Sequence, residues 1–228
     1  MKRSTLNQIM KEAIQFADSL KVKLPPFAYW TLDDWQNKGH EYDELRDTML
    51  GWDITDFGSG KYDEQGLLMF TIRNGSFHDP KYPKVYAEKM LIVKENQITP
   101  YHFHWKKMED IINRGGGTLC IQVYNSTPEG KLADTDVKVS SDGRNYIVPA
   151  GAVVRLTPGE SITLPCGMYH KFWGEGGTIL VWEVSQKNDD NVDNRFLEDV
   201  GRFPRIEEDE AIFYPLFNEI LLVNGQNV

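Results

Sequence analysis

The sequence predicts an all-β fold with a few helices at its N-terminal end. Short runs rich in β-branched and aromatic residues recur from residue 67 onwards, and clusters of glycine, proline and asparagine separate them. No helical pattern lies between these runs. This excludes the strand–helix alternation of a parallel sheet and favours a β-barrel or sandwich.

Length and composition narrow the class of protein. The chain has 228 residues and a net charge of −9, which fits one domain with a full sheet core and no nucleic acid partner, since an acidic surface repels phosphates. No stretch approaches the roughly 18 apolar residues of a membrane span, and no apolar region follows the basic start. We therefore expect a cytoplasmic protein without a membrane partner.

Helices are expected in about the first 50 residues, packed outside the sheet. Apolar residues from Leu6 to Leu20 recur three and four apart, which places them on one helix face, and Ser4 or Thr5 is the expected cap. Thr31 precedes a second helix with acidic residues in its first turn, and a third short helix is expected before Gly51.

The strands are expected where residues alternate with period two. They cover Leu67–Arg73, Ala87–Val93, Thr118–Tyr124, Val137–Ser140, Arg144–Val148, Ala152–Leu156, Ser161–Leu164, Tyr169–Trp173 and Thr178–Val184. Turns are expected between them, including Gly115–Gly117 and Gly174–Gly177. Residues of about 195–228 should return over the barrel as a strap, so that residues 1–228 form a single domain.

Three of the histidines form a pattern typical of a metal site. His102 and His104 are two apart, so on a strand they point to the same face, about 7 Å apart. Glu109 follows five residues later, and His170 comes after a bend rich in glycine and proline. Three imidazoles and one carboxylate suit Mn(II), and also Zn(II), Co(II), Ni(II) or Fe(II).

The spacing of these residues resembles the two motifs of the cupin family. The pattern is Asn96-x5-His102-x-His104-x4-Glu109-x6-Gly116, then Gly159-x5-Pro165-x-Gly167-x2-His170. Asn96 stands where cupins usually have glycine, and asparagine tolerates a left-handed turn conformation. The resemblance implies a cupin β-barrel, or jelly roll, with a bound divalent metal.

A more specific resemblance covers essentially the whole chain. The segments GWDITDFGSG, RNGSFHDPKYPKVYAEKM, QITPYHFHWKKMEDIINRGGG, LTPGESITLPCGMYHKFWGEGG and EVSQKNDDNVDNRF together resemble the bacterial D-lyxose isomerases. What this implies is reversible conversion of D-lyxose to D-xylulose, and more slowly of D-mannose to D-fructose, usually with Mn(II). The partner would be a free sugar. Cupins commonly pair through strand edges, so we expect a homodimer.

Such a reaction moves hydrogen between C1 and C2 of an open-chain sugar, by proton transfer through a cis-enediol or by hydride shift. Lys107 lies close to Glu109 in the chain and can hold a developing oxyanion. Glu183 ends a late strand and is a candidate acid–base group. Glu208, in the acidic run of the strap, is a third catalytic candidate if the strap covers the barrel mouth.

Two further residues are candidates for binding the sugar. Lys89 alternates with Leu91 and Val93, so it shares a face with apolar residues and needs a partner there. Arg202 lies in the strap, from which its guanidinium can reach a hydroxyl.

Three other functions are also compatible with the sequence. An Fe(II) dioxygenase can use the same cupin ligands. A cupin sugar-phosphate isomerase would need converging Arg or Lys residues, and the sequence shows no obvious basic cluster. A non-enzymatic sugar-binding cupin would bind without turnover.

Overall fold

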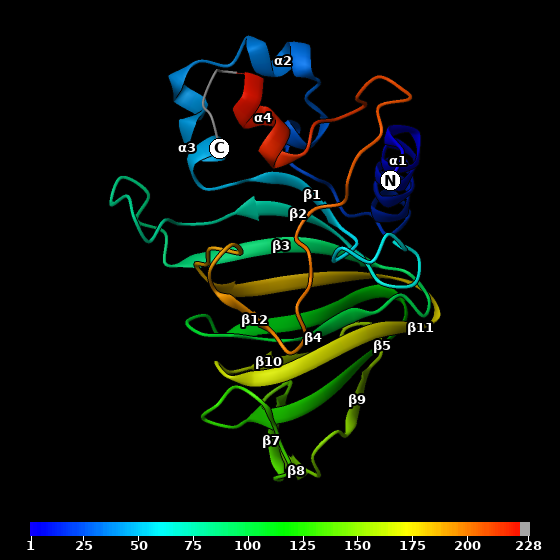
Figure 1. The fold of residues 1–228 in the computed structure, drawn as a ribbon, viewed down its shortest axis with the longest axis vertical. Coiled ribbons are helices and arrows are strands. Elements are labelled where there is room, and N and C mark those ends of the chain that lie inside the picture. Colours follow the sequence, from blue (N-terminus) through cyan, green and yellow to red (C-terminus); the bar gives the residue numbers. More distant parts are fainter. Residues whose placement is uncertain (224–228) are drawn as a thin grey trace.

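The computed structural model describes residues 1–223, so the last five residues of the expected strap lie outside it. Twelve strands form one antiparallel system in the order β1-β2-β3-β11-β5-β10-β7-β8, with β4, β6, β9 and β12 paired beside this path (Figure 1). The strands are β1 Gly51–Thr55, β2 Leu67–Arg73, β3 Tyr86–Val93, β4 Thr99–His104, β5 Glu109–Ser126, β6 Leu132–Ala133, β7 Val137–Ser141, β8 Arg144–Val148, β9 Val153–Leu156, β10 Ser161–Leu164, β11 Met168–Gln186 and β12 Asn194–Phe196. The predicted all-β cupin barrel is confirmed.

The two long strands β5 and β11 belong to two sheets at once. The first part of β5 pairs with β10 and its later part with β9, while β11 pairs first with β4 and then with β3. The two strands also pair with each other, from Met168↔Asn125 to Ser185↔Glu109. Because both strands continue from one sheet into the other, the sheets enclose a common interior.

The expected glycine turns are wrong at two places. Gly115–Gly117 lies within β5, and Gly174–Gly177 lies within β11, where the register of the pair shifts. Gly116 has φ +99°, and a Cβ there would lie 2.0 Å from the carbonyl oxygen of Thr178. A glycine bulge uses the same positive φ as a turn, so the sequence does not distinguish the two.

Four α-helices of residues 1–223 lie outside the sheets. They are α1 Arg3–Ser19, α2 Leu32–Gln36, α3 Asp43–Asp47 and α4 Phe217–Val223, with 3-10 turns at Pro26–Tyr29 and His40–Tyr42. None of the helices within residues 1–223 has the length and apolar character needed to cross a membrane. The second helix follows Thr31, as predicted, and Thr31 caps it through a reciprocal pair with Asp34.

The predicted side-chain cap of α1 is wrong. Lys2 is the N-cap residue and makes no capping hydrogen bond. The first turn is satisfied from the other end of the chain, because the amide of Arg3 donates to the Glu207 carbonyl and the amide of Ser4 donates to the Asp209 carboxylate. The start of α1 is therefore attached to the C-terminal strap.

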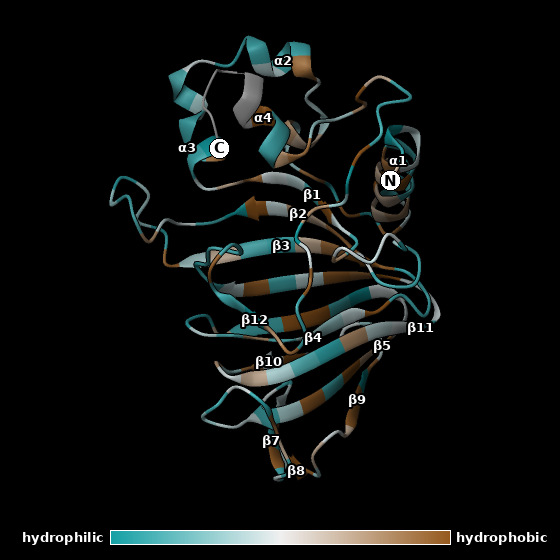
Figure 2. Cartoon of the chain, in the orientation of Figure 1, coloured by the Kyte–Doolittle hydropathy of each residue, from teal (hydrophilic) through white to brown (hydrophobic). Residues whose placement is uncertain are grey.

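Buried apolar residues form two layers. One fills the barrel, and the other lies between the outer face of β1–β3 and α1. In β2, Leu67 faces the barrel layer, while Leu68 and Phe70 face the helix layer. Strands covered on both faces lose the alternation of polar and apolar residues, and this is why β1, fully buried at all five positions, was not expected. Figure 2 shows the mixed hydropathy along these strands.

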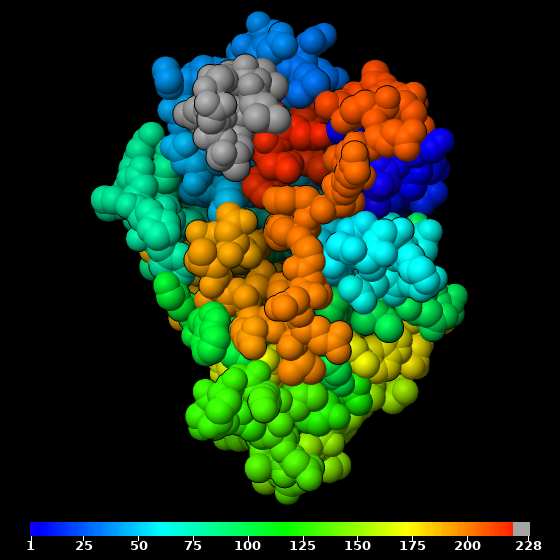
Figure 3. All heavy atoms as spheres, in the orientation of Figure 1, coloured from blue at the N-terminus to red at the C-terminus, as the bar shows by residue number. Residues whose placement is uncertain are grey.

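The segment after β11 crosses the open face of the sheets. It pairs with β4 through β12, and the amide of Leu197 donates to Tyr101 and that of Gly201 to Phe57. In Figures 1 and 3 this orange segment passes in front of the strands toward the N-terminal helices. Asn194, Phe196, Gly201 and Arg202 of this segment form part of the wall of the cavity that contains the candidate site.

Candidate metal centre and active site

Three histidine side chains meet in the barrel. His102 and His104 project from β4, and His170 projects from β11 directly opposite His102. All three are buried, and one ring nitrogen from each lies within 4.8 Å of those of both others. These residues can hold a metal ion.

The orientation of two of the rings suits metal binding. Nδ1 of His102 lies 2.8 Å from the Pro100 carbonyl oxygen, and Nδ1 of His170 lies 3.1 Å from that of Met168. A carbonyl only accepts, so each Nδ1 carries the proton and each Nε2 keeps its lone pair. Nε2 of His170 is buried and makes no hydrogen bond within residues 1–223.

Burial also keeps the imidazoles of His102 and His170 neutral. It lowers the pKa of His102 well below its ordinary value, with the neighbouring His170 and His104 acting in the same direction. It likewise lowers the pKa of His170 to about 4. A neutral imidazole is the form that binds a metal.

Glu109, the first residue of β5, adds a carboxylate to the group. Its Oε1 lies 3.3 Å from Nε2 of His104 and 3.4 Å from Nε2 of His170, and its Oε2 lies 2.8 Å from Nζ of Lys107. Burial would raise the pKa of Glu109, but Lys107 and His104 outweigh it and hold this pKa well below its usual range. The residues present therefore fit a divalent cation with nitrogen and oxygen ligands.

A cavity of about 600 Å³, its open mouth included, lies beside this group. One part of its wall is apolar, and the other is polar and charged. The apolar part consists of Phe57, Leu67, Met69, Leu91, Ile111, Phe172 and Phe196. The polar part, apart from the metal group, includes Lys89, Lys107, Glu183, Asp190, Asn194 and Arg202.

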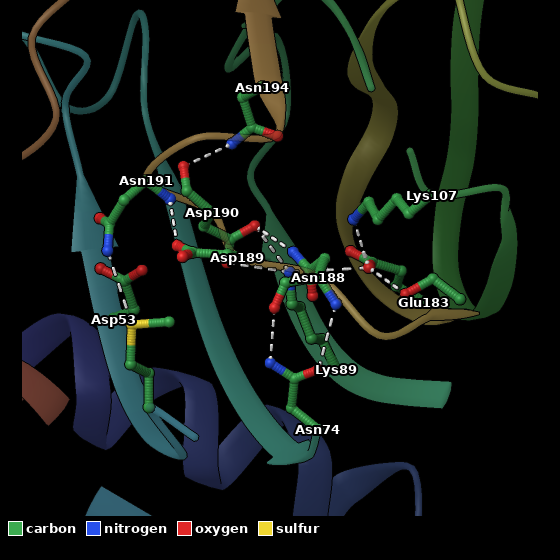
Figure 4. Close-up of polar contacts among 12 residues, drawn as sticks. Asp53, Asn74, Lys89, Lys107, Glu183, Asn188, Asp189, Asp190, Asn191 and Asn194 are labelled. Carbon is green, nitrogen blue, oxygen red and sulfur yellow. Dashed lines mark hydrogen bonds and ion pairs between the residues drawn. The ribbon is translucent and has the colours of Figure 1, made fainter. Parts of the chain in front are cut away.

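The charged side chains form a chain of contacts through the polar part (Figure 4). Glu183 Oε1 lies 2.6 Å from Nζ of Lys107 and 3.6 Å from Nζ of Lys89, and Nζ of Lys89 lies 3.0 Å from Asp190. Burial opposes the charge of Lys107, but Glu109 and Glu183 raise its pKa above the ordinary value. Burial opposes the charge of Asp190 too, and Lys89 and Lys107 still hold its pKa below the usual range.

Comparison with known proteins agrees with this geometry. A family model described as D-lyxose isomerase matches residues 1–220. The chain belongs to the D-lyxose isomerase family. It is 46% identical to a D-lyxose/D-mannose isomerase of Escherichia coli O157:H7, over 96% of this chain and 98% of that protein. It is also 46% identical to a D-lyxose/D-mannose isomerase of Serratia proteamaculans, over 97% and 98% of the two chains.

The fold extends to a more distant group of structures. The L-ribose isomerase of Acinetobacter sp. DL28, solved with L-ribose, superposes with a TM-score of 0.60 at 15% identity, over 91% of this chain and 98% of that one. At this identity the likeness establishes the shared fold.

In this member of the D-lyxose isomerase family, most of the candidate residues from the sequence lie together. Lys89, Lys107, Glu183 and Arg202 line the same cavity as His102, His104 and Glu109, and His170 adjoins Glu109. Arg202 pairs with Asp53 of β1. The exposed Cys166 lies outside this group.

Glu208 differs from the expectation. It does not line the cavity, its side chain is 58% exposed, and it pairs at 2.6 Å with the buried Arg3 of α1. The strap passes over the cavity earlier, near Asn194–Arg202, and has reached α1 by the time it arrives at Glu208. The position of Glu208 outside the cavity is therefore inconsistent with the expected catalytic role.

Asp190 lines the cavity but was not among the residues expected from the sequence. Its only signal was the polar segment Asn188–Asn194, which resembled the family but contained several equivalent carboxylates and amides. In the structure Asn188 is fixed to Asn74 by two hydrogen bonds, and its side chain donates to Asp190 (Figure 4). These contacts select Asp190 to face the cavity.

Proposed function

We propose that this chain is a divalent-metal-dependent aldose–ketose isomerase that interconverts D-lyxose and D-xylulose, and D-mannose and D-fructose. Family membership over nearly the whole chain supports the reaction class. The observation that carries the proposal is the placement of the Lys107–Glu183 pair in one cavity with the histidine group.

Four side chains are proposed as metal ligands: His102, His104, Glu109 and His170. Mn(II) is the proposed ion, and Zn(II), Co(II), Ni(II) and Fe(II) suit the same ligands. A divalent ion held there supplies Lewis acidity that polarises the sugar carbonyl and lowers the pKa of the neighbouring hydroxyl.

Glu183 is the proposed acid–base group. Its carboxylate removes the proton from C2 of the open-chain aldose and returns it to C1, while the hydroxyl proton of C2 moves to the carbonyl oxygen of C1. This gives the ketose with no net loss of atoms. Lys107 is fixed by Glu109 and Glu183 and donates a hydrogen bond to the oxygen on which negative charge develops.

The buried carboxylate of Glu183 lines the cavity beside the metal group, and this favours the enediol route over a direct hydride shift. The two routes differ in the source of the transferred hydrogen. Isomerisation in D2O incorporates solvent deuterium at the reacting carbon by the enediol route, whereas the hydride route retains the substrate's own hydrogen.

The charge balance of the cavity disfavours a sugar phosphate. Each of its cations is already paired: Lys107 with Glu109 and Glu183, Lys89 with Asp190, and Arg202 with Asp53. A phosphate would need a cation free of such a partner. The free sugar is the better-matched substrate.

The cytoplasmic location stays a prediction.

We further propose that the protein works as a homodimer joined at a strand edge. One end of the main path is β8, on which Ile147 is 71% exposed. An edge strand with an exposed apolar side chain is suited to pairing with a second copy. Light scattering at micromolar concentration tests this, and a monomeric mass would contradict it.

The activity is tested on metal-stripped protein reloaded with Mn(II) and incubated with D-lyxose under anaerobic conditions. D-xylulose should form, and a chelator should abolish its formation. Product without oxygen excludes a dioxygenase reaction as its source, and turnover excludes a purely sugar-binding role. No ketose from D-lyxose or D-mannose would overturn the proposal.

A further inference from the structure

The cavity contains more polar side chains than the reaction at C1 and C2 requires. The metal group, Lys107 and Glu183 account for the reacting end of the sugar. Lys89 and Asp190 lie beyond them, and Arg202 and Asp53 close the same side. A buried sugar hydroxyl needs a hydrogen-bonding partner, which the apolar part of the wall does not provide.

Strand register gives this polar side a direction. Glu183 of β11 is opposite Lys89 of β3, and Lys89 is opposite Thr71 of β2. Neighbouring strands are about 4.8 Å apart, so this row extends about 10 Å from β11, on the side away from β5 and Glu109. It provides polar contacts along an extended carbon chain whose first two carbons lie at the metal group.

A second, narrower chamber continues the row. Lys89, Asp190 and Arg202 line both the main cavity and this chamber, so they form the boundary between the two. Beyond the boundary the chamber is lined by Thr71, Asn74, Asn188 and Asp53, among others, and has room for about one water molecule. A single hydroxyl group fits that space.

Asp190 is held at this boundary by a fixed loop. The side-chain amide of Asn74 donates to the Asn188 carbonyl at 2.8 Å, and the amide of Asn188 donates back to Asn74 at 3.2 Å. The Asn188 side chain donates to Asp190, which accepts from Lys89 through both oxygens at 3.0 Å. Asn74 and Asn188 are thus positioning residues for the Lys89–Asp190 pair.

We propose that Lys89, Asp190 and Thr71 form the subsite for the tail of the sugar, and that Thr71 sets the acceptance of a sixth carbon. The terminal hydroxyl of a pentose meets Lys89 and Asp190. The additional hydroxymethyl group of a hexose extends past them, so that its hydroxyl enters the small chamber at Thr71. This inference rests on the proposed isomerase function.

The test pairs each variant with a sugar that lacks the matching hydroxyl. For Thr71→Val, kcat/KM for D-mannose should fall about 3- to 10-fold, while kcat/KM for 6-deoxy-D-mannose should change by less than about twofold. For Asp190→Asn, kcat/KM for D-lyxose should fall about 10-fold or more, and kcat/KM for 5-deoxy-D-lyxose should fall markedly less. Thr71→Ser keeps the hydroxyl, so its ratio of kcat/KM for D-mannose to kcat/KM for 6-deoxy-D-mannose should match that of the unsubstituted protein.

Thr55→Val is the control, because Thr55 lines the main cavity from β1, opposite the apolar residue Leu67, and does not line the small chamber of Thr71. This substitution should change kcat/KM for D-mannose and kcat/KM for 6-deoxy-D-mannose by the same factor. Equal losses on both members of each pair in Thr71→Val and Asp190→Asn would overturn the tail subsite. Failure of the unsubstituted protein to isomerise D-lyxose would instead overturn the proposed function, so the two failures are distinct.

Discussion

Lys107 and Glu183 form a buried ion pair in which Nζ lies 2.6 Å from Oε1, although Glu183 lies 76 positions later in the chain. Lys107 comes from the loop between β4 and β5, and Glu183 from the second half of β11. Both side chains are at most 5% exposed. Burying charges costs free energy that such a pair only partly recovers, so its position beside the histidines indicates a functional role.

Replacement of Lys107 should separate metal binding from catalysis. We expect Lys107→Ala to keep its bound metal and to lose about 10²- to 10⁴-fold in kcat, because the developing oxyanion loses its donor. Metal analysis and initial rates on the same sample measure both. The neighbouring Lys106→Ala is the control and should stay near the unsubstituted rate. Unchanged turnover in Lys107→Ala would contradict its role.

Removal of a histidine ligand should have a different signature. His170→Ala and His102→Ala should lose metal and activity together, because each removes one of the imidazoles of the buried group. Metal content is measured by mass spectrometry after dialysis. His40→Ala is a suitable control, since the His40 side chain is fully exposed. Full metal content in His170→Ala would refute the ligand assignment.

The buried histidines should make the metal-free protein sensitive to acid. The pKa of His170 is about 4 when folded, against 6.5 as its ordinary value, so the unfolded chain binds more protons between these pH values. Stability is therefore fully present above about pH 6.5 and decreases as pH falls toward 4, by at most about 3 kcal/mol from this group. Urea unfolding of metal-stripped protein at pH 7 and pH 4.5 measures the loss. The free energy of unfolding of His170→Gln should fall less between pH 7 and pH 4.5. An equal fall in the variant would contradict the assignment of this acid sensitivity to His170.

Glu208 gives a test of the strap's path. Glu208→Gln should keep kcat/KM within about twofold, because its carboxylate pairs with Arg3 outside the cavity. Arg3→Ala should lower the free energy of unfolding by about 1–3 kcal/mol, since Arg3 is buried and also pairs with Glu219. Thermal melting and steady-state rates separate the two effects. A large loss of turnover in Glu208→Gln would return this residue to the active site.

Local patterns predicted much of this structure from the sequence. The spacing of His102 and His104 on a strand, and the alternation that turned Lys89 inward, both depend only on the two-residue period. Asp190 was beyond such reasoning, because its direction is set by contacts with Asn74, which is distant in the chain. The path of Glu208 was missed for the same reason, since its partner is at the opposite end of the chain.

Pairing of β5 with β11 should control how fast this protein folds. The partners Met168 and Asn125, and Ser185 and Glu109, are far apart in the chain, so a long loop must close before either contact forms, and folding dominated by such non-local contacts is slow. The β7–β8 hairpin needs no such closure and can form early. Because both sheets share β5 and β11, neither can be completed alone, and we expect refolding from urea to show them gaining protection from hydrogen exchange in the same slow phase.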